Sequence, residues 1–207
     1  MKRNLQLTIS IALFTILIFS FGCVKEPCLD IVELDKQSAI TKEWFVNDSI
    51  GNQIIVDKNG ISQTLTISSR HQQKWDDIVE DDCGNIYGSF YFTIQYNTSL
   101  SPVHFMVDIH GSGLSEDGFY LKLTVTNTNS VGHKSATYDF VTGSCRENNA
   151  NVEIVNGNLI ANKFDNEVLK IEFKNTNAPN DIKTVYYAKG YGIIKFVEDN
   201  GNEFEIE

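Results

Sequence analysis

Apolar and polar residues alternate in short stretches of this chain from Trp44 onward. Even positions are apolar in 90–96, and odd positions are apolar in 103–109. A period of two places one face of a strand in a core and the other in water, as in antiparallel sheets. The pattern predicts strands at these two stretches and at four others, namely 64–68, 121–126, 169–174 and 203–207.

Turn sequences rich in Gly, Asn and Asp separate the predicted strands, and they lie at 50–52, 58–60, 82–85, 116–118, 155–158 and 199–202. Asn-Gly and Asp-Gly supply the positive φ that tight hairpin turns need. Many short strands joined by such turns predict an all-β fold. We expect a single-domain antiparallel β-sandwich or partly open barrel over residues 44–207.

Two segments depart from this alternation. In residues 30–43, Ile31, Leu34 and Ser38 could share one helical face, which predicts a short helix after a tether formed by residues 24–29. Residues 70–82 mix Trp75 and other apolar residues with several acids. For this second segment we predict either a helical turn between strands or an acidic loop.

The start of the chain has the three parts of an export signal. Two basic residues precede the apolar stretch 5–19, which is shorter than the roughly 20 residues that a bilayer span needs. Ser20-Phe21-Gly22-Cys23 follows, and it resembles the lipobox of bacterial lipoproteins. The resemblance implies that the signal peptide 1–22 is removed and that Cys23 becomes a lipidated N-terminus, with two or three acyl chains that anchor it stably. The alternative is a plain signal peptide or an uncleaved N-terminal helix.

Two further resemblances concern location. Val24-Lys25-Glu26 resembles the start of lipoproteins sorted to the outer membrane, and Lys before an acid resembles the export signal of Bacteroidota surface lipoproteins. Residues 184–196, which contain Tyr-Tyr-Ala-Lys-Gly-Tyr-Gly-Ile-Ile-Lys-Phe at 186–196, resemble the final hairpin of small envelope lipoproteins from that group. The glycines at 190 and 192 permit a bulge or sharp bend there. These resemblances imply a lipid-anchored protein of the cell envelope, facing the periplasm or displayed on the surface. Related β-rich envelope folds include carriers of lipids and lipoproteins.

The net negative charge of the chain limits the classes of partner that we expect. The formal net charge is −10, and removal of the signal peptide takes away Lys2 and Arg3 but no acid, which leaves −12. Such a chain repels nucleic acid and anionic lipid, so we expect neither as a direct partner beyond the lipid anchor itself. The sequence contains no P-loop, dinucleotide fingerprint or nucleophile elbow, so we predict no cofactor and no enzymatic activity.

Three cysteines remain when Cys23 carries lipid. They are Cys28, Cys83 and Cys145, in an oxidising compartment where disulfides persist. We predict a Cys83–Cys145 disulfide, because both residues lie in turn-like sequences within the β-rich region. Cys28 lies close to the anchor and would be left over.

Two groups of residues could bind a metal ion. Asp108 and His110 fall on one face of a predicted strand and would need a third ligand from a neighbouring strand. The acidic run could bind Ca²⁺ through several oxygens, although it lacks the spacing of a calcium loop; its acids are Asp76, Asp77, Glu80, Asp81 and Asp82. A polar outer face and a solvated loop are the alternatives.

Three tyrosines lie opposite the apolar positions of their strands, namely Tyr91, Tyr120 and Tyr186. Aromatic rings on a rigid sheet can stack on sugars or anchor a partner protein, and cross-strand pairing is the alternative. We therefore expect a non-enzymatic binding or interaction module with a protein or glycan partner. A carrier of a lipid or carbohydrate is the second reading, and a hydrolase with scattered acids is the third.

Overall fold

The computed structural model describes residues 31–80, 86–99, 102–111, 118–128, 133–157, 167–176, 178 and 180–207, and in 31–35, 74–80 and 86–89 it describes the backbone. Residues Ile31–Glu207 form one compact unit. The predicted signal peptide, Cys23, Cys28, Cys83, Asp81 and Asp82 lie outside the described residues, as do the side chains of Asp76, Asp77 and Glu80.

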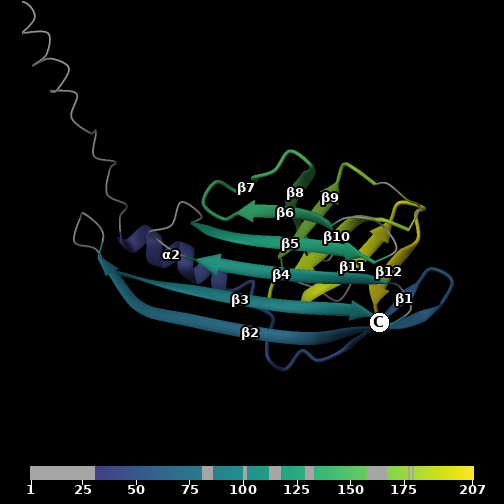
Figure 1. Cartoon of the computed structure of the whole chain (residues 1–207), viewed down its shortest axis with the longest axis horizontal. Coiled ribbons are helices and arrows are strands. Elements are labelled where there is room, and N and C mark those ends of the chain that lie inside the picture. Colours follow the sequence, from purple (N-terminus) through teal and green to yellow (C-terminus); the bar gives the residue numbers. More distant parts are fainter. Residues whose placement is uncertain are drawn as a thin grey trace, which may run out of the picture. The chain divides into compact units, whose positions relative to one another are not determined.

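The described residues form an all-β fold, as the alternation predicts, together with one short helix (Figure 1). The elements are α2 (Ile31–Lys42), β1 (Gln53–Asp57), β2 (Ser62–Glu80), β3 (Ile86–Thr98), β4 (Val103–Gly111), β5 (Phe119–Asn127), β6 (His133–Asp139), β7 (Ser144–Cys145), β8 (Ala150–Asn156), β9 (Glu167–Phe173), β10 (Ile182–Ala188), β11 (Gly192–Glu198) and β12 (Glu203–Ile206). The short helix predicted in 30–43 is therefore confirmed.

One antiparallel sheet contains all twelve described strands, in the order β7-β6-β5-β4-β3-β2-β1-β12-β11-β10-β9-β8. Consecutive strands pair with each other except β7 and β8, and β1 also pairs with β12. The two strands at the ends of this order, β7 and β8, follow each other in the chain. The sheet is nearly closed into a barrel, so the partly open barrel is the form the fold takes.

The inner face of the sheet carries the core. Its largest fully buried side chains are aromatic or aliphatic and come from strands all around the sheet, among them Tyr96, Tyr187, Phe92, Phe105, Phe196, Leu121 and Leu123. They lie at the alternating positions that the sequence marks as apolar, because strand geometry sends every second side chain to the same face. Burial of this face is the main source of stability.

The segment after α2 fills part of this interior. Trp44 is only 1% exposed and packs on Tyr187, whose hydroxyl donates a 3.0 Å hydrogen bond to the Trp44 carbonyl. Phe45 stacks on Phe92 with 4.7 Å between ring centroids. Lys189 forms an ion pair with Glu43 and holds this segment against the end of β10. The barrel therefore encloses its own side chains.

Two glycines are required by close packing. A Cβ on Gly111 would lie 2.2 Å from the Phe90 ring, and a Cβ on Gly192 would lie 2.1 Å from the Tyr96 hydroxyl. Gly192 also has φ of 92°, which L-residues rarely adopt. The register between β10 and β11 shifts beside it, between Tyr186 and Tyr187. The predicted bulge in the tail is therefore confirmed.

The prediction for 70–82 is wrong, because residues 70–80 belong to the long strand β2. This half of β2 pairs with β3 from Arg70↔Ile94 to Glu80↔Ile86. Arg70 and Gln72 oppose buried residues of β3, although both are polar. Pairing with the apolar β3 overrides the weak local preference of this stretch.

Candidate functional site

The outer face of β3 to β7 gathers four of the residues that the sequence singles out, namely Tyr91, Asp108, His110 and Tyr120. Strand pairing places Tyr91, His110, Tyr120 and Asp139 side by side across four strands. Asp108 lies one row along, opposite Thr93. We call Tyr91, Asp108, His110, Tyr120, Asp139 and Arg146 the Tyr120 surface.

Asp108 anchors one side of the Tyr120 surface. Its Oδ1 atom accepts hydrogen bonds from the Tyr91 hydroxyl at 2.8 Å and from the Thr93 hydroxyl at 2.7 Å. Asp108 is buried, so two hydroxyl donors at short distance compensate for lost water. Burial raises the pKa of Tyr91, and the nearby Asp108 carboxylate adds to that rise. Tyr91 therefore stays a neutral donor.

Three planar groups stack in the middle of the Tyr120 surface. The rings of His110 and Tyr120 stack with centroids 5.2 Å apart and planes 27° apart. The Arg146 guanidinium lies over the Tyr120 ring, 5.2 Å from its centroid. Stacked planar groups have few rotamers left, so this arrangement is rigid before any ligand arrives.

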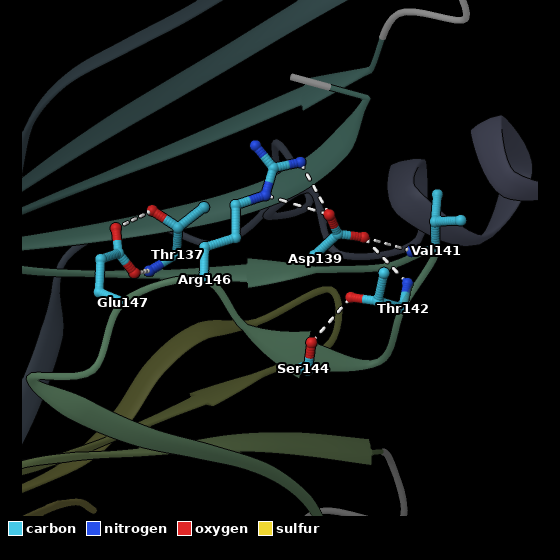
Figure 2. A network of polar contacts seen from close by, with 7 residues as sticks. All are labelled: Thr137, Asp139, Val141, Thr142, Ser144, Arg146 and Glu147. Atoms are coloured by element: carbon cyan, nitrogen blue, oxygen red, sulfur yellow. Dashed lines mark hydrogen bonds and ion pairs between the residues drawn. The ribbon is translucent and has the colours of Figure 1, made fainter. Parts of the chain in front are cut away.

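Asp139 fixes the far edge of the Tyr120 surface (Figure 2). Arg146 donates to Asp139 Oδ2 from Nε at 3.1 Å and from a terminal nitrogen at 2.8 Å. The backbone amides of Val141 and Thr142 donate to the other oxygen, at 2.8 and 3.0 Å. Burial opposes the charged form, but these hydrogen bonds and the Arg146 charge outweigh it and lower the pKa of Asp139.

Figure 2 also shows a second carboxylate clamp next to this one. Glu147 accepts from the amide and the hydroxyl of Thr137, both at 2.6 Å. The thiol of Cys145 donates to the same carboxylate at 3.7 Å. These contacts hold the residues on both sides of Arg146 in place. The guanidinium itself is held by Asp139 and by the Tyr120 ring.

A different row crosses the other half of the sheet. Glu153, Lys170, Tyr186, Lys195 and Glu205 lie side by side on β8 to β12, and we call them the Tyr186 row. Lys170 pairs with Glu153 at 2.8 Å, and Lys195 lies 5.9 Å from the Tyr186 ring centroid. Tyr186 therefore lies far along the sheet from Tyr91 and Tyr120, and the three tyrosines do not form one patch.

The structure bears on the metal prediction only in part. Among the described residues no group of three or more His, Cys, Asp or Glu could hold a metal ion. The third ligand that Asp108 and His110 would need is therefore not found there. The calcium prediction for the acidic run rests on side chains outside the described residues.

Cys145 is a half-buried free thiol, and burial raises its pKa. Because its predicted partner Cys83 lies outside the described residues, the disulfide between them stays a prediction.

Sequence reasoning missed Asp139 and Arg146, two members of the Tyr120 surface. The available signal was Asp139-Phe140-Val141-Thr142, in which an acid precedes a turn and can accept from the amides two and three residues on. Arg146 gave no such signal, because only the pairing of β5 with β6 brings it over Tyr120. The assembled surface presents planar rings, fixed hydrogen-bond groups and a held guanidinium.

Comparison with known proteins does not identify this chain, because no protein-family model, no curated protein and no solved structure matches it. In the described part of the chain, no helix is both long enough and apolar enough to cross a membrane.

Proposed function

We propose that this protein is a lipid-anchored lipoprotein of the cell envelope that acts as a non-enzymatic binding or interaction module. The proposed location and lipid anchor rest on Ser20-Phe21-Gly22-Cys23 and the apolar stretch before it. The binding role rests on the Tyr120 surface, in which aromatic, carboxylate and guanidinium groups are fixed on the outside of the barrel. A fixed set of groups loses little entropy on binding, which suits recognition of a glycan or protein.

The carrier role is the weaker alternative. A carrier in a β-barrel places its ligand inside the barrel. Here Trp44 and Phe45 enter that interior and pack on Tyr187 and Phe92. A lipid would have to displace these rings, so the outer face supports a binding role better than the inner face does.

A glycan array tests the binding role. The intact lipoprotein in detergent micelles is applied to immobilised neutral and acidic oligosaccharides, and His110→Ala and Arg146→Ala are compared with the wild type. Tyr186→Ala serves as the matched control, because it removes an outer-face aromatic from the other half of the sheet. We expect selective glycan binding that the first two variants lose and the control keeps. Equal binding by all four proteins would exclude the Tyr120 surface.

The anchor is tested separately by growth with labelled palmitate. The full chain should incorporate label, and Cys23→Ala should not. Label that persists in Cys23→Ala would disprove lipidation at Cys23 without touching the binding role.

A further inference from the structure

The two ends of the sheet differ in the hydrogen bonds that their outer backbone groups form. On the β7 side, the connection 146–149 follows the edge of β6. The Arg146 amide donates to the Thr137 carbonyl at 2.9 Å, and the Asn149 side chain donates to the Ser135 carbonyl at 3.2 Å. Glu147 accepts from the Thr137 amide. The backbone groups of β6 that face this edge are thus hydrogen-bonded by the connection.

In the described part of the chain, no connection hydrogen-bonds to the outer edge of β8 in this way. The Lys174 amide donates to the Asn149 carbonyl at 2.9 Å, and this pair sets which β8 residues bond to β9. In an antiparallel ladder every second residue bonds to the same neighbour, so Asn151, Glu153 and Val155 face β9. The amides and carbonyls of Ala150, Val152 and Ile154 point away from it. Among the described residues, no hydrogen bond reaches those groups from another element.

A second hydrogen bond supports this assignment. On the far side of β9, the Lys189 amide donates to the Glu167 carbonyl at 3.0 Å. Odd residues of β9 therefore bond to β10, which leaves Val168, Lys170 and the other even residues for β8. Both sides of β9 give the same alternation.

The side chains along this edge define what could pair with it. Ala150 and Val152 pack on the core, and Ile154 lies on the same face but is 43% exposed. On the outer face, the Glu153 side chain is 58% exposed and shares Lys170 with Glu172. The edge thus offers an apolar side chain on one face and a half-exposed carboxylate on the other.

We propose that the edge of β8 binds an extended segment of a partner protein, which adds to the sheet as a further strand. Unpaired amides and carbonyls at strand spacing are matched by another extended backbone. The segment would place an apolar residue against Ile154 and a Lys or Arg near Glu153. This surface is separate from the Tyr120 surface, so the proposal goes beyond the binding role given above.

A second copy of this chain is a poorer occupant. Each copy carries a formal net charge of −10, or −12 once the predicted signal peptide is removed, so two copies repel each other. Pairing of two β8 strands about their central residue would also place Glu153 opposite Glu153, and like charges directly opposite are destabilising. A basic, alternating segment avoids both penalties.

The test uses the full chain in detergent micelles and a short synthetic peptide of alternating lysine and valine. Val152→Pro removes an amide that faces the open edge, where proline is tolerated in a sheet. Val152→Ala is the matched control, because it shortens the same side chain and keeps the amide. A peptide N-methylated at alternate residues has the same charge but lacks the donors. Ile154→Lys is a second variant that opposes the peptide by charge.

We expect saturable binding of the peptide to the wild type and to Val152→Ala. Val152→Pro and the N-methylated peptide should each weaken binding by about tenfold, the effect of losing one to two backbone hydrogen bonds. Ile154→Lys should weaken binding through charge repulsion of the lysine-rich peptide. Amide exchange at Val152 and Ile154 should slow when the peptide is added. Unchanged thermal midpoints would show that the variants fold.

Three results would overturn the proposal. One is the absence of saturable binding, and another is equal binding of the N-methylated peptide, which would mean attraction by charge alone. The third is a wild-type dimer in sedimentation that Val152→Pro converts to monomer, which would assign the edge to a second copy.

Discussion

The Tyr120 surface and the Tyr186 row occupy the same kind of place, the outer face of neighbouring antiparallel strands, yet they are held differently. Hydroxyls, backbone amides and a two-point guanidinium contact fix Asp108 and Asp139. In the Tyr186 row, Lys170 and Lys195 link carboxylates whose side chains are 39 to 58% exposed. Exposed pairs of flexible chains contribute little and are screened by salt.

This contrast shows what holds the side chains of an outer face in place. Cross-strand pairing alone brings a tyrosine beside charged residues in both halves. Only the Tyr120 surface adds a turn, residues 140–143, whose amides bind Asp139 and thereby hold Arg146 over a ring. The difference lies in backbone donors, because they are already fixed by the fold and need no further ordering.

The largest effect should come from the glycine beneath the Tyr186 half. Gly192→Ala forces a Cβ against the buried Tyr96 hydroxyl and strains a residue with positive φ, at a combined cost of about 3 kcal/mol in unfolding free energy. Gly111→Ala on the Tyr120 side meets the Phe90 ring without positive φ and should cost less. Urea titration measures both. A larger loss for Gly111→Ala would show that strain at the bulge is minor.

Asp139→Asn should be the next largest, at about 2 kcal/mol, because a carboxylate with four hydrogen bonds becomes a neutral amide. The folded pKa of Asp139 is lowered, so its stabilisation is complete above its ordinary value of 3.8 and is lost as pH falls through the lower folded value. Urea titrations from neutral pH into this acid range should show a shallower decline for Asp139→Asn. An unchanged acid profile would contradict the pKa assignment.

Removal of one hydroxyl distinguishes the two halves directly. Tyr91→Phe loses the donor to Asp108 and should cost about 1 kcal/mol. Tyr186→Phe should change stability by less than half as much, because Tyr186 contributes its ring beside Lys195. Thermal unfolding of both variants at one pH provides the measurement. Equal losses would mean that the halves are held alike.

A similarly small effect is expected for Lys195→Met. Its ion pairs with Glu203 and Glu205 involve half-exposed carboxylates, so we expect a loss of about 0.5 kcal/mol that disappears in high salt. Arg146→Met should cost more and should keep its cost in salt, because its partner Asp139 is more buried than Glu203 and Glu205 and accepts two hydrogen bonds from the guanidinium. If the stability loss of Arg146→Met also disappeared in high salt, the two regions would be held by the same kind of contact.

Much of the fold follows from local pattern. Alternation in 90–96 and 103–109 identifies which residues of β3 and β4 face the core, and it places Tyr91, Asp108 and His110 outside. The failure at 70–80 has a physical cause. That half of β2 has polar residues on both faces, and its strand form depends on pairing with β3.

The sequence by itself determined the class of fold, the inward and outward faces of the clearest strands, and the bend at Gly192, because strand period and glycine conformation are local properties. Only the tertiary structure decided that the sheet nearly closes, that Trp44 and Phe45 occupy its interior, and that Arg146 covers Tyr120. It also decided that Tyr186 stands apart from Tyr91 and Tyr120, and that β8 ends the sheet formed by the described strands. These outcomes depend on which strands become neighbours, and that choice is made by burial of the whole inner face at once.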